Sequence, residues 1–491
     1  MKRVAHALMR AASPLMGTLA SLVLLVPCFW QPRIQAGDLS SHIYNAWLAQ
    51  LIERGQAAGL TLAPQSNNVL FDLMLSGLMR AFGASAAQRI AVSIAVLVFF
   101  WGAFAFVWSS SRRGPRNPPW QLAPCLAMLA YGWVFHMGLF NFYMSLGLCF
   151  GAMALARHRK PWTVAAAILL LGIAYVAHAL PAAWSVGVLV YTRFAQALAP
   201  RRRVALMIGM LAALALVGFV LGAFFPTRRG MHQLLAITGA DQVWIYGRYY
   251  VALSLAVLAV WALCFERVLR MRGIARTLLD VRFQVCALCA AAWVLLPGGV
   301  LLPGFRSALD YIAERMSLAG AVLFCAMIAS VRLPKPLVGA MAVIALVFFG
   351  FSYADERALN RVETEMERAV AQLPPGQRVV SVLADPESRI KSLAHVVDRI
   401  CVGRCFSYAN YEPATAQFRV RADHANPFVV SDYGESWEIQ TGGYVVKPRD
   451  LPMYNIDLCA PPNPRICVAP LRAGTTLHNT GLRVVPALGG G

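Results

Sequence analysis

The sequence predicts a polytopic α-helical membrane protein with a small extracytoplasmic α/β domain at its C-terminus. Two observations on composition support this fold class. The 491 residues are 58% hydrophobic and only 14% charged, whereas soluble domains carry about 25% charged residues. Residues 355–491 hold 15 of the 44 basic and 15 of the 23 acidic residues, so residues 1–354 carry the whole net charge of +21. We therefore divide the chain into a membrane domain, 1–354, and a soluble tail, 355–491.

Eleven apolar runs qualify as transmembrane helices, because a spanning helix needs about 20 mostly apolar residues. They lie at 12–31, 88–108, 121–136, 139–156, 162–179, 182–198, 204–225, 249–265, 283–302, 313–330 and 336–353. The shorter stretch 69–83 contains Asp72 and Arg80. We expect it to form an interfacial or re-entrant helix.

The basic residues predict the orientation of these spans. With the N-terminus in the cytoplasm, 20 of the 29 basic residues of the membrane domain fall in cytoplasmic loops, as the positive-inside rule requires. Eleven spans then place the tail and the first outer loop, 32–87, in the periplasm of a bacterial inner membrane. A signal peptide cleaved before Gly37 is the alternative interpretation of the N-terminus. It leaves the outer loop on the same side.

The composition also limits the kind of partner. The membrane domain is too apolar to be disordered. Its basic residues punctuate apolar runs instead of forming one stripe, so a nucleic-acid partner is not indicated. Membrane lipids are the expected surroundings.

The tail is expected to begin with a charged helix that ends at Pro374. Strands are predicted at 378–384, 418–422, 428–433 and 437–446, and a helix at 392–402. We find no phosphate loop, Gly-x-Ser-x-Gly motif or metal-ligand cluster in the tail.

Four of the eleven cysteines lie in the tail, as two close pairs. An oxidising periplasm allows disulfides, whereas zinc sites with such spacings usually include a His pair, which is lacking here. We therefore favour the disulfides Cys401–Cys405 and Cys459–Cys467. The other seven cysteines are expected to be small buried hydrophobes.

Acidic residues are the sharpest functional signal in the membrane domain. Six of its eight acidic residues map to the outer face or its rim: Asp38, Glu53, Asp72, Asp241, Asp310 and Glu314. Charges near hydrocarbon are costly, and they tend to line a cavity or to pair with a basic residue. The pattern predicts an outer cleft that contains carboxylates and arginines.

The first outer loop carries the earliest of these acids. In QAGDLSSHIYNAW, Asp38 is suited to cap a helix, and His42 follows one turn later. A single span, this acidic residue, a juxtamembrane helix ending in ERGQAAGL, the amphipathic stretch NNVLFDLMLSGLMRAFGAS and a second span follow in order over 12–109. This arrangement resembles the GT-C superfamily of integral-membrane glycosyltransferases.

The resemblance implies a polyprenyl-phosphate-linked sugar donor, bound from the bilayer, and transfer to a glycan, lipid or protein acceptor of the envelope. Asp38 matches the catalytic carboxylate of the family by position. Many members carry a second carboxylate directly after it, where this chain has Leu39. This departure bears on metal dependence, so a divalent metal stays an open alternative, with Asp38 and His232 as its candidate ligands.

Other outer residues are candidates for substrate contacts, because a leaving phosphate is stabilised by guanidinium groups. The candidates for substrate binding are His42, Arg228, Arg229, Asp241, Arg306 and Arg315. Contact with lipid headgroups and a structural Glu314–Arg315 ion pair are the alternatives.

Two rival functions are consistent with the same fold class. A transporter or flippase predicts internal repeats and ionisable residues at mid-membrane depth, whereas the carboxylates here cluster outside. A non-catalytic envelope scaffold predicts an outer cleft that is filled by side chains.

Overall fold

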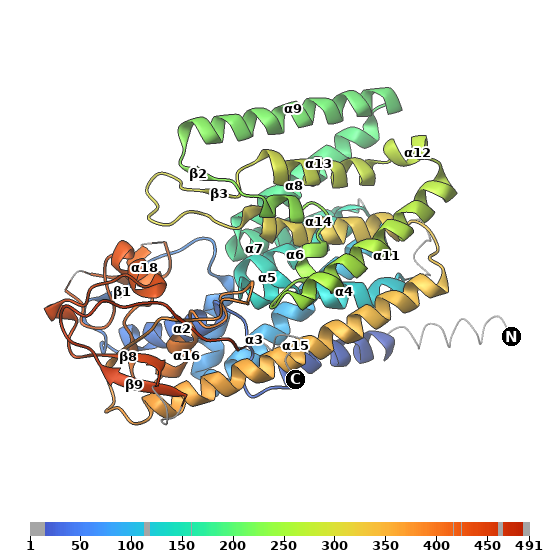
Figure 1. The fold of residues 1–491 in the computed structure, drawn as a ribbon. Coiled ribbons are helices and arrows are strands. Elements are labelled where there is room, and N and C mark those ends of the chain that lie inside the picture. Colours follow the sequence, from blue (N-terminus) through green and yellow to red (C-terminus); the bar gives the residue numbers. More distant parts are fainter. Residues whose placement is uncertain are drawn as a thin grey trace.

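The computed structural model describes residues 15–111, 118–158, 160–415, 417–423, 425–459 and 465–484. Helices make up most of these residues, and the largest sheet lies in the C-terminal part of the chain. Figure 1 shows a bundle of helices with the tail, in orange and red, packed against one end. The first residues of the predicted span 12–31 fall outside the described part.

In the described part of the chain, four helices are long and apolar enough to cross a membrane: α3 (Leu70–Ser110), α9 (Pro200–Phe224), α11 (Tyr249–Arg272) and α15 (Lys335–Val370). Four apolar helices are shorter: Leu15–Cys28, α6 (Phe140–Ala156), α7 (Pro161–Ala177) and α13 (Val281–Leu295). The protein is therefore membrane-embedded.

Two more predicted spans are occupied by α8 (Ala179–Ala197) and α14 (Ile312–Ile328), and one is divided between α4 (Ala123–Ala130) and α5 (Trp133–His136). Eleven membrane crossings stay a prediction.

Helices α3 and α6 form the most tightly packed part of the bundle. A Cβ atom at Gly102 of α3 would lie only 2.1 Å from the carbonyl oxygen of Gly147 on α6, so both backbones approach closely, as small residues allow in membranes. Helix α9 is the opposite case. Only Gly218 of its 25 residues is buried, and Figure 1 shows the helix along one edge of the bundle. Its apolar surface is therefore available to lipid.

Helix α3 joins the predicted interfacial stretch to the following span. Gly83 (φ 77°) interrupts the helix with a kink, a conformation that glycine adopts without steric cost. Beyond it, Ala84–Ser110 are 27 helical residues, which rise about 40 Å. This length exceeds a hydrocarbon core of about 30 Å. This part of α3 is thus long enough to reach from one face of a membrane to the other.

The predicted boundary at residue 354 lies inside α15, which continues unbroken into its charged second half. Four strands form the sheet of the tail, in the order β6 (Phe406–Ser407), β4 (Arg378–Ser381), β8 (Met453–Leu458) and β9 (Ile466–Pro470). Strands β6, β4 and β8 run parallel, and β9 pairs antiparallel with β8.

The tail is joined to the first outer loop by backbone pairing. Strand β1 (Leu60–Leu62) pairs antiparallel with β7 (Val420–Ala422), in register with Leu60 opposite Ala422. Buried apolar residues of the bundle, the outer loop and most of the tail form one continuous core. Tail and membrane domain are thus packed together.

Several predicted tail elements differ in the structure. The predicted strand 437–446 is wrong, because helix α18 (Tyr433–Thr441) occupies its first half. The Asp432 side chain caps this helix by accepting the backbone N–H of Glu435 at 3.0 Å, and Gly442 (φ 78°) ends it. The segment 428–433 is no strand either, and the predicted helix 392–402 is shortened to α16 (Val396–Cys401). The predicted strand 378–384 becomes β4 and the short β5 (Leu383–Ala384).

Both favoured cysteine pairs are joined in the structure. The Cα atoms are 4.4 Å apart in Cys401–Cys405 and 5.3 Å apart in Cys459–Cys467. The seven other cysteines are free, and all but Cys286 are buried.

Candidate functional site

A cavity of about 540 Å³ lies where the first outer loop, the helix bundle and the tail meet. Five of the residues singled out from the sequence line it: Asp38, His42, Arg228, Asp310 and Arg315. The structure thus brings together residues from the first outer loop, a later outer loop and the start of α14.

The Asp38 backbone is fixed on both sides. Asp38 is the N-cap residue of α2 (Leu39–Glu53), but its side chain makes no capping hydrogen bond. Its backbone N–H donates to the Met137 carbonyl at 3.0 Å, and that of Gly37 donates to His136 at 2.8 Å. Gly138 (φ 81°) completes the contact, because a Cβ atom there would lie 2.5 Å from the Asp38 nitrogen. The carboxylate is therefore held in place by the backbone and left free for the cavity.

His395 of the tail forms an ion pair with Asp38, and no sequence pattern had singled out this histidine. Its Nε2 lies 3.7 Å from an Asp38 carboxylate oxygen, and its Nδ1 lies 3.2 Å from Asp398. Ser407 donates its hydroxyl to the other oxygen of Asp398. Burial opposes the charged form of His395, but the hydrogen bond and charge of Asp398 outweigh it and raise the pKa of the imidazole. The only signal in the sequence is the i, i+3 spacing of His395 and Asp398.

Arg315 presents an unpartnered guanidinium. It stands in the first turn of α14 and lines the cavity. Its Nε is buried without a partner, and no hydrogen bond or ion pair joins its guanidinium to a residue that the structure describes. The predicted alternative, a Glu314–Arg315 ion pair, does not form, because Glu314 pairs with His232 at 3.0 Å. A buried donor without a partner is costly, so this guanidinium is suited to an anionic ligand.

The other candidate arginines are engaged by protein groups. Arg228 lines the cavity and pairs with Asp310 at 3.3 Å, with 75% of its side chain exposed. Arg229 does not line it. It donates to carbonyls at the ends of α9 and α13 and so ties these two helices together. Arg306 donates to the Ala414 carbonyl at 3.2 Å, beside the cavity wall.

Asp241 is a contact between the bundle and the tail, outside the lining of the cavity. Its carboxylate pairs with Arg389 at 3.2 Å and accepts the Ser317 hydroxyl. Burial raises the pKa of Asp241 to about 6, against the opposing charge of Arg389. The Arg389 guanidinium also lies over the rings of Trp133 and Trp244. The structure thus gives Asp241 a role in packing.

The candidate metal ligands are separated in the same way. His232 is paired with Glu314 and does not line the cavity that Asp38 lines. Within the described ranges, no group of three or more His, Cys, Asp or Glu side chains could hold a metal ion. These donors therefore do not fit a metal site of the predicted kind.

His42 belongs to a buried polar cluster at the edge of the cavity. Its Nδ1 lies 2.6 Å from the Asp72 carboxylate, which also accepts the Asn141 side chain at 2.7 Å. Burial opposes protonation of His42, but the charge of Asp72 outweighs it and raises the pKa to about 9. Glu412 accepts the Ser41 hydroxyl nearby, and burial raises its pKa. The cluster links α2 to α3, α6 and the tail.

Aromatic and basic residues of the tail complete the cavity. The tail residues in its lining include Lys391, Tyr411, Phe418, Tyr433 and Trp437. Lys391 lies over the ring of Trp437, 5.1 Å from its centroid. Nothing in the local sequence marks these residues, because only the β1–β7 pairing and the packing of the tail bring them to Asp38.

No family model, no curated protein and no solved structure matches this chain. The fold and the cavity define its class: a membrane-embedded helical protein whose C-terminal region contributes to a charged cavity. Any narrower function has to be argued from the cavity.

Proposed function

We propose that the protein is an integral-membrane glycosyltransferase. It would move a sugar from a polyprenyl-phosphate donor to an envelope acceptor, on the periplasmic face of a bacterial inner membrane. One observation carries the proposal: the Asp38 carboxylate and the unpartnered Arg315 guanidinium line the same cavity. A base for a hydroxyl and a cation for a phosphate are the two groups that this reaction needs.

The chemistry follows from these two groups. The acceptor hydroxyl attacks the anomeric carbon and gives its proton to Asp38. The bond from that carbon to the donor phosphate oxygen breaks, and the electron pair leaves with the phosphate. Arg315 then faces a more negative phosphate than in the ground state, so its stabilisation is largest after bond breaking.

His395 acts as a positioning residue in this scheme. Asp398 fixes one ring nitrogen, which directs the other nitrogen toward Asp38. An imidazole whose pKa is raised places positive charge beside the Asp38 carboxylate and helps to hold its orientation.

The cavity wall supports entry of a lipid-linked donor. Four apolar or aromatic residues in the lining are substantially exposed: Leu302 at 39%, Phe305 at 50%, Tyr311 at 37% and Trp437 at 46%. Exposed apolar surface of this kind is typical of a membrane or ligand contact. A prenyl chain would lie against it, while the sugar phosphate reaches the charged residues.

The test uses the full chain in lipid, with a panel of polyprenyl-phosphate sugars as donors. We expect Asp38→Asn to abolish sugar transfer, because a positioned base contributes about 10²–10⁴-fold. The matched control is Asp423→Asn, an exposed carboxylate outside the cavity lining, which should retain activity. Equal rates in wild type and Asp38→Asn would contradict the proposal. Movement of intact donor across a vesicle, without cleavage, would instead favour a transporter or flippase.

Arg315→Gln separates binding from chemistry in the same assay. Loss of a charged hydrogen-bond donor should weaken donor binding or its turnover by about tenfold or more. Arg306→Gln, which loses only a bond to a backbone carbonyl, is the control. Equal donor affinity and turnover in all three proteins would remove Arg315 from the site.

A further inference from the structure

A second cavity, of about 760 Å³, lies at the other end of the helix bundle. Its lining residues come from the C-terminal parts of α3, α6, α8, α11 and α14, from the first turns of α9 and α13, and from the short helix α12 (Ile274–Leu278). Ser110 of α3 lines it, whereas Asp72, at the start of α3, contacts His42 of the first cavity. Because the straight part of α3 rises about 40 Å, the two cavities are separate sites near opposite membrane faces.

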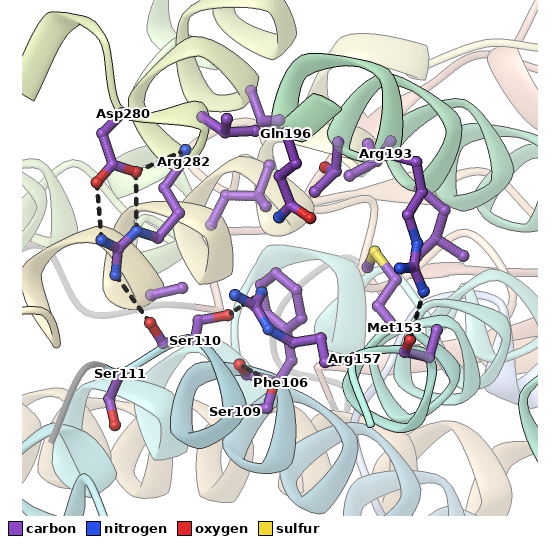
Figure 2. Close-up of a pocket in the computed structure, with 18 of the residues that line it drawn as sticks. Phe106, Ser109, Ser110, Ser111, Met153, Arg157, Arg193, Gln196, Asp280 and Arg282 are labelled. Carbon is purple, nitrogen blue, oxygen red and sulfur yellow. Dashed lines mark hydrogen bonds and ion pairs between the residues drawn. The ribbon is translucent and has the colours of Figure 1, made fainter. Parts of the chain in front are cut away.

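Positive charge dominates this second cavity. The described lining residues include six arginines, which are Arg157, Arg193, Arg203, Arg272, Arg276 and Arg282. Asp280 is the single carboxylate among them. Figure 2 shows Asp280 with Arg282 on one side of the cavity and Arg193 on the other. We refer to this site as the arginine cavity.

Asp280 is engaged by the arginines on its own side. Its oxygens accept from Arg282 at 2.8 and 2.9 Å and from Arg272 at 2.5 Å. Arg282 also donates to the Ser110 carbonyl at 2.8 Å. This half of the arginine cavity is a network of ion pairs, with the side chain of Asp280 only 8% exposed.

Four arginines remain without a carboxylate contact in the described part of the chain. Arg157 donates to the Ser110 hydroxyl at 3.1 Å, and Arg193 to the Ala156 carbonyl at 2.7 Å. Arg203 donates to the Leu198 carbonyl at 2.9 Å, and no described group contacts the exposed Arg276. Each guanidinium has five N–H donors, so most donors here are free for an anion. Capping of helix ends therefore explains only part of this cluster.

The wall between the helices is apolar. Its side chains are Phe106, Met153, Val188, Leu189, Val285 and Leu323. A small inorganic anion would leave this surface uncovered, whereas an amphipathic ligand would place a phosphate among the arginines and a hydrocarbon chain along the wall. Basic pockets between membrane helices are suited to anionic lipid headgroups.

We propose that the arginine cavity is a binding site for the phosphate headgroup of an anionic membrane lipid. The site is independent of the proposed sugar transfer, because none of its lining residues belongs to the Asp38 cavity. By the predicted orientation it takes its ligand from the cytoplasmic leaflet, where anionic lipids and basic residues meet.

The test is a lipid titration of the full chain in a neutral detergent. Phosphatidylglycerol is added to one series, zwitterionic phosphatidylcholine to a second and inorganic phosphate to a third. Bound lipid is counted by native mass spectrometry, and thermal stability is followed in parallel. We expect phosphatidylglycerol to bind and to raise the melting temperature, since a ligand of the folded state stabilises it.

Two variants locate the site. In Arg157→Gln/Arg276→Gln, affinity for phosphatidylglycerol should fall about tenfold or more, because two charged donors are lost. Arg276→Gln alone should fold normally, since no described residue depends on its side chain, and it should show a smaller fall. Arg201→Gln/Arg202→Gln removes the same charge from exposed positions that do not line the cavity, and should bind as wild type.

Three results would overturn the proposal. The first is equal lipid occupancy in the site variant and the Arg201/Arg202 control. The second is equal binding of phosphatidylcholine and phosphatidylglycerol. The third is stabilisation by inorganic phosphate as strong as by lipid, which would assign the cavity to a soluble phosphate compound. Failure here leaves the sugar-transfer assay on Asp38 unaffected.

Discussion

The two cavities at the ends of the bundle differ in charge and in construction. The Asp38 cavity mixes acids with bases, and the tail supplies much of its lining. The arginine cavity is built by helix ends and carries nearly one sign of charge. Mixed charge is suited to a reaction in which a proton and a phosphate charge move, whereas charge of a single sign is suited to holding a fixed anion. Loosening the tail should therefore harm one cavity and spare the other.

Arg399→Ala should have the largest effect. Arg399 lies on α16 and pairs with Glu363 of α15, with side chains only 8% and 1% exposed, and it donates to the Ile34 carbonyl at 2.8 Å. Removing one partner of a buried ion pair costs about 3–5 kcal/mol of unfolding free energy. Denaturant titration measures this loss, and sugar transfer should fall with it. Phosphatidylglycerol binding at the arginine cavity should persist while the bundle is folded.

The control for Arg399 is Arg449→Ala. Arg449 pairs with Glu435, but its side chain is 61% exposed, and exposed pairs contribute about 0–1 kcal/mol. A loss of stability in Arg449→Ala as large as that in Arg399→Ala would mean that buried attachment of the tail is not what holds the cavity together.

The His42–Asp72 pair predicts a pH dependence at the Asp38 end alone. His42 has a pKa raised from its ordinary 6.5 to about 9. Its contribution to stability is therefore fully present below about pH 6.5 and is lost as the pH rises through 9. The loss is at most on the order of 3 kcal/mol. Unfolding measured from pH 6 to 10 should show this slope in wild type.

Asp72→Asn removes the partner and should flatten the slope. Glu412 faces the same cluster and its pKa is also raised, by burial, so Glu412→Gln separates the two contributions. An unchanged slope in Asp72→Asn would assign the pH dependence to other groups. Lipid binding at the arginine cavity should not follow the His42 titration in any of these proteins.

Local sequence signals predicted one half of the site. The apolar runs located the helices, and Asp38 followed from its position just beyond a span. Arg315 could be predicted as a candidate because a charged residue at the rim of a span needs a partner or a cavity. The two disulfides could be predicted because the cysteines of each pair lie close together in the sequence.

The remaining half depends on contacts between distant segments. His395 lies more than 350 positions after Asp38, and the β1–β7 pairing that joins the tail to the outer loop leaves no periodic pattern in three-residue strands. The packing role of Asp241 could not be predicted either, because its ion-pair partner Arg389 comes from the tail. The strand expected at 437–446 was wrong because the Asp432 cap and Gly442 favour a helix there. Tertiary packing thus decided what propensity and spacing left open.

Gly138→Ala tests the smallest effect, the placement of Asp38 by its backbone. A Cβ atom at Gly138 would meet the Asp38 nitrogen at 2.5 Å, so the backbone has to shift by a fraction of an ångström. Under the proposed function, such a shift of Asp38 should lower the rate of sugar transfer by about tenfold. Gly55→Ala is the matched control, since Gly55 has φ 71° and no atom within 4 Å of its Cβ position. It carries the same backbone strain, of roughly 1–2 kcal/mol, without the clash.

Equal rates of sugar transfer in Gly138→Ala and Gly55→Ala would show that the position of the Asp38 backbone does not affect the reaction. A rate loss confined to Gly138→Ala, with phosphatidylglycerol binding unchanged, would tie the chemistry to one end of the bundle and lipid binding to the other.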